Sequence, residues 1–158
     1  MTAMRRSDRE ITDPNEIFDI LRRCEVCHLA LGGEYPYVLP LNFGFCHENG
    51  VLTLYFHGAS EGEKLDRIRR DPRAGFAAET NVRLRVSEAP CGCTAGFESV
   101  IGFGTASVVT DHAERKKGLT LLLRHCGHEG NLDFDPRVLE KTTVFKLTAD
   151  HFTAKRHE

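Results

Sequence analysis

The segment from Val26 to His57 places the strongest constraint on the fold, because strand-like runs follow one another there with no room for a helix between them. The runs are Val26–Leu31, Tyr37–Phe45 and Val51–Phe56. The last two are joined through Asn49-Gly50, a pair that favours a tight hairpin turn because both residues tolerate positive φ. Strands joined by such short connections must run antiparallel. This half of the chain therefore predicts an antiparallel sheet.

The second half of the chain adds further strand-like segments. Ala74–Glu79 and Glu98–Val109 are apolar, and Gly102 and Gly104 in the longer one predict bending or close backbone approach. Thr143–Leu147 and His151–Lys155 close the chain as a hairpin or one broken strand, and residues 81–96 form a loop or an irregular strand pair. Pro40 cannot donate to a neighbouring strand, so it marks a sheet edge, a bulge or a backbone that faces a ligand.

Three segments have the capping residues and spacing of helices. Asp13, Pro14 and Glu16 open an amphipathic helix over residues 14–24. Ser60 and Glu63 form a second capping box, for a helix that stops before Pro72, and Asp111 caps a third that reaches about Cys126. The expectation is one α+β domain over residues 1–158, mainly β. It is a six-stranded antiparallel sheet curled into a small barrel with flanking helices, and residues 1–12 form an N-terminal arm.

Composition narrows the class of function. The 158 residues carry 21 Lys plus Arg against 23 Asp plus Glu, a net charge of −2, which lacks the broad positive field of nucleic-acid-binding proteins. No apolar run approaches the length of a membrane span, and the N-terminus has no apolar signal core. We therefore expect a cytoplasmic protein that binds neither nucleic acid nor membrane, with its six cysteines reduced.

The densest group of polar and small residues is Tyr55–Lys64, which follows a strand and leads into a helix. Free amides at the start of a helix, with the Lys64 ammonium close by, suit a phosphate group. An ordinary capped helix with a solvated lysine accounts for the same residues.

Four stretches together resemble the FMN-binding split-barrel superfamily, which is typified by the pyridoxamine 5′-phosphate oxidases, and in particular its nitroimidazole-resistance branch. They occur in the order of that family and are Met4–Ile11, Pro36–Phe43, Tyr55–Lys64 and Glu98–Gly104. The resemblance covers most of the chain and implies a split β-barrel that binds FMN without a covalent bond.

The resemblance also implies which residues hold the cofactor. The strand with Pro40 would lie along the isoalloxazine ring, the end of the Val51–Phe56 strand would pass the ribityl chain, and Lys64 would bind the phosphate. The implied cofactor-binding residues are Leu39, Pro40, Leu41, Asn42, Tyr55, Phe56, His57, Lys64 and Ser99. Such proteins work as homodimers with each flavin at the subunit interface.

Two departures limit what the resemblance implies about the substrate. The C-terminal Ala154–His157 offers no obvious match to the arginines that grip substrate phosphate in pyridoxamine phosphate oxidases, which argues against vitamin B6 oxidation. Residues 88–97 vary among members where a substrate pocket would form. His57 is the candidate catalytic residue, since an imidazole beside a flavin can donate a proton. It is equally explained as a residue that binds the phosphate or a loop carbonyl.

The cysteines suggest two further sites. Cys24-Glu25-Val26-Cys27-His28 matches the attachment motif of c-type haem, but that attachment requires export. Cys24 and Cys27 could bind zinc with Cys91/Cys93 or Cys126/His128, although the second pair lacks a standard spacing. Buried free thiols explain the same residues, because cysteine packs as a small apolar side chain.

These observations favour an FMN-dependent oxidoreductase that reduces a small electron-poor compound such as a nitro-aromatic. The alternatives are a flavin- or haem-binding module without turnover, with His57 or His28 as axial ligand, a deazaflavin-dependent reductase, and a zinc-stabilised structural domain.

Overall fold

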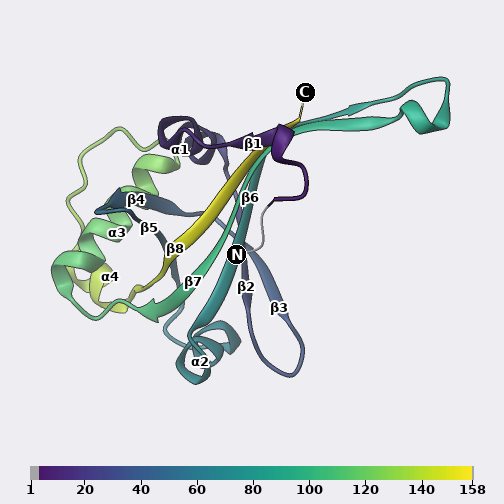
Figure 1. Cartoon of the computed structure of the whole chain (residues 1–158). Helices are drawn as coiled ribbons and strands as arrows, with labels where there is room; N and C mark the ends of the chain where they lie inside the picture. The colour runs from purple at the N-terminus through teal and green to yellow at the C-terminus, as the bar shows by residue number, and fades with distance from the viewer. Residues whose placement is uncertain (1–3, 158) are drawn as a thin grey trace.

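The computed structural model describes residues 4–157, and within them the chain forms eight strands and four α-helices (Figure 1). The strands are β1 (Glu10–Ile11), β2 (Cys27–Leu31), β3 (Tyr37–Leu41), β4 (Gly44–Glu48), β5 (Val51–Gly58), β6 (Arg73–Arg85), β7 (Thr94–Val108) and β8 (Thr143–His157). The helices are α1 (Pro14–Arg23), α2 (Glu63–Arg70), α3 (His112–His125) and α4 (Pro136–Lys141), with 3₁₀ turns η1 (Ser7–Arg9) and η2 (Pro90–Gly92).

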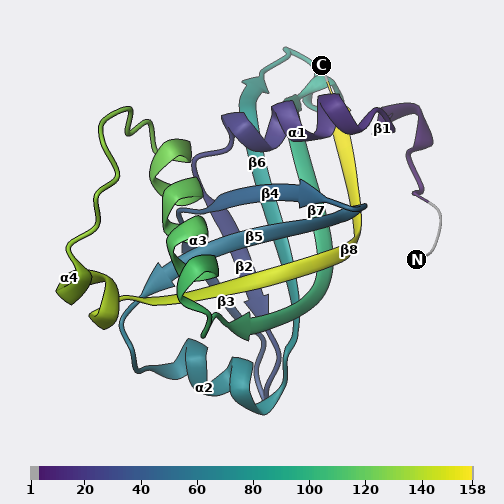
Figure 2. The same cartoon turned by 90° about the vertical axis from the view of Figure 1, so that its left-hand side faces the viewer.

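All strand pairs are antiparallel, and the strands form one sheet in the order β3-β2-β6-β7-β8-β5-β4, with β1 beside β8. β7 and β8 bend, so that β4, β5 and the first half of β8 cross over β2, β3 and β6 (Figure 2). The mainly antiparallel split-barrel fold is confirmed. The sheet has eight strands rather than six and stays open between β3 and β4.

The difference in strand number has two local causes. The predicted strand Tyr37–Phe45 breaks after Leu41, and its halves become β3 and β4 at opposite ends of the sheet order. At the break, the Asn42 side-chain amide donates to the carbonyl of Glu25 at 3.0 Å. The end of the predicted N-terminal arm forms β1, where Glu10 pairs with Lys155. The first three residues of that arm lie outside the described residues.

The hairpins follow the turn signals. Asn49 and Gly50 have φ values of 53° and 83°, which is the expected tight turn between β4 and β5. Residues 81–96 belong mostly to a long hairpin of β6 and β7, which projects from the body of the molecule with η2 near its tip (Figure 1). We call the projecting part, residues 81–96, the arm. The last two predicted segments form the single strand β8.

The helix predictions hold for α1 and α3 and fail at the start of α2. The Asp13 carboxylate accepts a hydrogen bond from the backbone amide of Asn15, and the Asp111 carboxylate accepts one from the backbone amide of Glu114. Both are the hydrogen bonds of N-capping residues. The predicted capping box of Ser60 and Glu63 does not form. α2 instead begins after Gly62, whose φ of 128° suits glycine, and has no side-chain cap.

The short helix α4, capped by Asp135, was not predicted. No helix in residues 4–157 is long and apolar enough to span a bilayer.

The buried side chains form two clusters. The larger fills the space between α1, α2 and the inward face of the sheet and includes Ile20, Leu29, Phe56 and Phe145. The smaller lies under α3 and α4 and contains Tyr55, Val109, Leu119, Leu139 and Val144.

The bend in β7 and β8 depends on close backbone contact, as the glycines predicted. A Cβ on Gly104 would lie 2.0 Å from the carbonyl oxygen of Thr148, and the β7–β8 register shifts between Phe103 and Gly104. Only glycine permits this approach.

Candidate functional site

The outward face of β2, β3, β6 and β7 carries a shallow apolar trough of about 370 Å³. In the strand register, one row across β3, β2, β6 and β7 consists of Val38, Ala30, Gly75 and Phe103. The next row across the same strands consists of Pro40, His28, Ala77 and Ile101. The small residues Ala30, Gly75 and Ala77 therefore form most of the floor on β2 and β6, together with His28, and larger side chains form the walls on β3 and β7. A flat ring system fits such a shape.

The walls of the trough are exposed in the single chain. Val38, Ile101 and Phe103 are 59%, 49% and 46% exposed, respectively. Large apolar side chains grouped on one surface usually mark a place where a ligand or another protein binds.

Polar groups lie beside the trough at its arm end. The imidazole Nδ1 of His28 is 3.6 Å from a carboxylate oxygen of Glu79. In the strand register, Glu79 stands opposite Ser99, and Ser99 opposite Lys155. Hydrogen-bonding and charged groups thus adjoin the apolar surface.

A second group of predicted site residues meets at the start of α2. A Cβ on Gly58 would lie 3.0 Å from Cε and 3.1 Å from Nζ of Lys64, so the lysine side chain crosses the backbone at the end of β5. Lys64 is partly buried, and its ammonium has no ion pair or hydrogen bond among the described residues. The uncapped amides of α2 begin at the same place. The arrangement suits a phosphate group.

Interactions with the β2–β3 loop fix the position of α2. Arg67 donates to the carbonyl oxygens of Gly32 and Tyr35 at 2.8 and 2.7 Å, and its guanidinium lies 4.9 Å from the centre of the Tyr37 ring. These contacts attach α2, whose N-terminus is the candidate phosphate site, to the hairpin of β2 and β3 that forms part of the trough.

The structure divides the predicted cofactor residues into three groups. Pro40, Asn42 and Ser99 are on or next to the outward face. His57 and Lys64 form the second group, with His57 exposed at the end of β5 and Lys64 against Gly58. The remaining side chains point inward. They are Leu39 and Leu41, packed against the larger cluster, Phe56, stacked on Phe145 at 5.3 Å, and Tyr55.

Tyr55 takes part in a partly buried polar network. Its hydroxyl donates to Glu114 at 3.0 Å, and Lys146 donates to the same carboxylate oxygen at 2.5 Å. Burial, and then the hydrogen bond to Glu114, raise the pKa of Tyr55. The side chains of Tyr55 and Phe56 are therefore closed to a ligand in the single chain.

The trough and the Lys64 group are not brought together by strand pairing. β3 and β5 are separated by β2, β6, β7 and β8 in the sheet order. Ile101 and Phe103 were missed as site candidates from the sequence, and His28 was considered only as a haem ligand. The signal was present in the alternation of Phe97, Ser99, Ile101 and Phe103, which places four non-glycine side chains on one face of β7.

The two cysteine pairs lie in different parts of the fold. Cys24 and Cys27 are fully buried in the core, whereas Cys91 and Cys93 are exposed near the tip of the arm. His28 points outward from the strand on which Cys27 points inward, so the three residues of the haem-attachment motif do not share a face. In the part of the chain that the structure describes, no three His, Cys, Asp or Glu side chains are grouped so as to hold a metal ion.

Comparisons with known proteins agree with this fold. The family model for pyridoxamine 5′-phosphate oxidase matches residues 13–156. The comparison with curated proteins gave no match.

Solved structures give further matches. A candidate 5-nitroimidazole antibiotic resistance protein from Bacteroides thetaiotaomicron is 25% identical, with 93% of this chain and 86% of that chain covered and a TM-score of 0.77. A FAD- and haem-binding protein from Mycobacterium smegmatis is 19% identical, with 95% and 74% covered and a TM-score of 0.75. The chain therefore belongs to the pyridoxamine 5′-phosphate oxidase family, within the superfamily of FMN-binding split barrels.

Proposed function

We propose that this protein binds FMN without a covalent bond and uses it to reduce a small electron-poor compound, such as a nitro-aromatic. The free Lys64 ammonium at the uncapped start of α2 is the observation that carries the proposal. Membership of the family and the 25% identity to the candidate nitroimidazole resistance protein support it.

The residues present fit the two ends of the cofactor. The phosphate would accept hydrogen bonds from Lys64 and from the first amides of α2. The trough, with its floor of Ala30, Gly75 and Ala77, gives a flat apolar surface for a ring system. Pro40, Asn42 and Ser99 border that surface.

A second copy of the chain completes the site in this proposal. The trough is shallow and its walls are exposed, so one chain can cover only one side of a flavin ring. In a homodimer, the partner would cover the other side and remove the exposed apolar surface from water.

The flavin would supply the redox step, because its ring accepts and passes on a pair of electrons. The protein would hold the ring and the phosphate, exclude water through the apolar trough and provide a proton. His57 is exposed next to Gly58 and Lys64, so its imidazole can hold a proton at the phosphate end or for a substrate.

Flavin binding by two variants tests the proposal. The purified protein should show flavin absorbance near ~450 nm, and Lys64→Ala should weaken FMN binding by about 1.5–3 kcal/mol, the range for a hydrogen bond to a charged group. Gly58→Ala should also weaken it, because the new methyl group displaces the lysine side chain.

Riboflavin, which lacks the phosphate, is the matched control ligand. Its affinity should be the same in the two variants and the unchanged protein. Equal losses for FMN and riboflavin would show that Lys64 does not bind the phosphate.

A haem-binding module is the second candidate, favoured by the half-buried imidazole of His28 on an apolar surface that could cover a porphyrin. A strong Soret band that disappears in His28→Ala would establish it in place of FMN. Yellow protein with no Soret band would reject it.

A further inference from the structure

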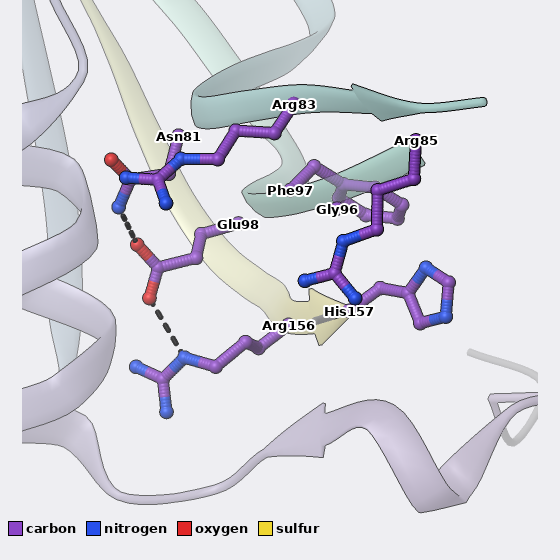
Figure 3. Close-up of a pocket in the computed structure, with 8 residues that line it drawn as sticks. All are labelled: Asn81, Arg83, Arg85, Gly96, Phe97, Glu98, Arg156 and His157. Carbon is purple, nitrogen blue, oxygen red and sulfur yellow. Dashed lines mark hydrogen bonds and ion pairs between the residues drawn. The ribbon is translucent and has the colours of Figure 1, made fainter. Parts of the chain in front are cut away.

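A second pocket, of about 340 Å³, lies at the base of the arm (Figure 3). We call it the arm pocket. Its charged side chains are Arg83 and Arg85 from β6, Glu98 from β7 and Arg156 from β8. In Figure 3 the Arg83 side chain reaches across to Asn81 above Glu98, and the Arg85 side chain extends toward His157.

A β-bulge places Arg83 and Arg85 in this pocket. Thr80 pairs with Glu98 and Arg83 pairs with Gly96, so two residues of β6 stand opposite one residue of β7. Asn81 takes the left-handed conformation there, with φ of 55°. Because a bulge reverses the alternation of the strand, Arg83 and Arg85 lie on the face of Glu98. Without it, Val82 and Leu84 would occupy that face.

Glu98 does not need these arginines as partners. Its carboxylate accepts from Arg23 at 2.6 Å, from Asn81 at 2.5 Å and from Arg156 at 2.8 Å, and the residue is only 7% exposed. A buried carboxylate with three such donors already has its hydrogen-bonding and charge requirements met. The bulge therefore places two guanidinium groups, those of Arg83 and Arg85, beside a carboxylate that already has its partners.

Two of the arginines that line the arm pocket have no acidic partner among residues 4–157. Arg23 and Arg156 pair with Glu98, and Arg156 also lies 3.6 Å from Glu16. The side chains of Arg83 and Arg85 make no ion pair or hydrogen bond within residues 4–157.

We propose that the arm pocket binds the phosphate group of a small phosphorylated molecule. A phosphate dianion balances the charges of Arg83 and Arg85, and the planar fork of a guanidinium matches two phosphate oxygens at once. This site differs from the FMN phosphate site, because Lys64 is on α2 and the arm pocket is formed by β6, β7 and β8.

Isothermal titration of the protein as purified, with inorganic phosphate and with methyl phosphate as separate probes, tests this proposal. Arg83→Ala and Arg85→Ala should each weaken binding by about tenfold, as expected for loss of a charge-assisted hydrogen bond. Arg83→Lys, which keeps the charge without the fork, should give a smaller loss. Methyl phosphate binding as well as or better than inorganic phosphate would identify a monoester as the ligand, and weaker binding would identify free phosphate.

Two control variants separate this site from general charge effects and from the flavin site. Arg137→Ala removes an arginine that is 92% exposed on α4 and should leave phosphate affinity unchanged. Lys64→Ala should also retain it. The proposal is overturned if neither probe binds at millimolar concentration, if Arg137→Ala weakens binding as much as Arg85→Ala, or if only Lys64→Ala abolishes it.

Discussion

At the scale of single residues, Glu98 links stability to pH. Burial by itself raises the pKa of Glu98, but hydrogen bonds from Arg156, Arg23 and Asn81 outweigh burial and hold the pKa below the usual 4.5. A carboxyl group whose pKa is lower in the folded state stabilises the fold above its unfolded-state pKa. That contribution is lost as the pH falls from about 4.5 through the folded-state pKa. Glu114, whose pKa is lowered chiefly by Lys146, acts in the same direction.

Melting temperature measured between pH 7 and pH 3 checks this prediction. The protein should lose stability steeply below pH 4.5. Glu98→Gln should melt lower at pH 7, because its partners lose a charged acceptor, and should lose less on acidification. Parallel curves for the two proteins would contradict the assignment.

The cysteines should divide by burial into reactive and protected thiols. Burial raises the pKa of Cys24 and Cys27 to about 12, so neither forms a thiolate near neutral pH. Cys91, Cys93 and Cys126 are exposed. Iodoacetamide at pH 8 should modify these three in the native protein and reach Cys24 and Cys27 only after unfolding, as read by mass spectrometry of peptides. Rapid labelling of Cys24 in folded protein would disprove the buried placement.

At the scale of elements, the packing of α3 on β4 depends on Gly44. A Cβ there would lie 2.3 Å from the backbone nitrogen of Leu122, and backbone cannot move aside as a flexible side chain can. Gly44→Ala should therefore lower the free energy of unfolding by at least ~1–3 kcal/mol. Gly130→Ala is the matched control, because its Cβ would meet only the His128 side chain at 3.2 Å. Equal stability of the two variants in urea denaturation would disprove the close packing.

At the scale of the whole molecule, the exposed trough predicts a dimer. Sedimentation should give about twice the chain mass of 17.7 kDa. Phe103→Glu places a charge on the trough wall and should give a monomer that has lost its flavin. Val138→Glu, at a 62% exposed apolar residue on α4, should change neither property. A monomeric unchanged protein that binds FMN tightly would contradict the dimer.

The sequence by itself determined the elements whose signals are local. Asp13-Pro14 predicted the start of α1, and Asn49-Gly50 predicted the turn between β4 and β5. Alternating or apolar runs predicted most of the strands. Each of these signals depends on residues that are close along the chain. The antiparallel fold class followed from the short connections. Lys64 became a candidate from local sequence alone, because it lies in the first turn of α2 beside the amides that it accompanies.

Only the tertiary structure decided which side chains face a ligand. Tyr55 and Phe56 adjoin His57 in sequence, but both are buried because β5 lies between β8 and β4 with helices packed over it. The trough joins residues from four strands, and the arm pocket exists because one bulge reverses the faces of β6. Both depend on register between strands distant in sequence, and a shift of one residue would turn every side chain to the other face.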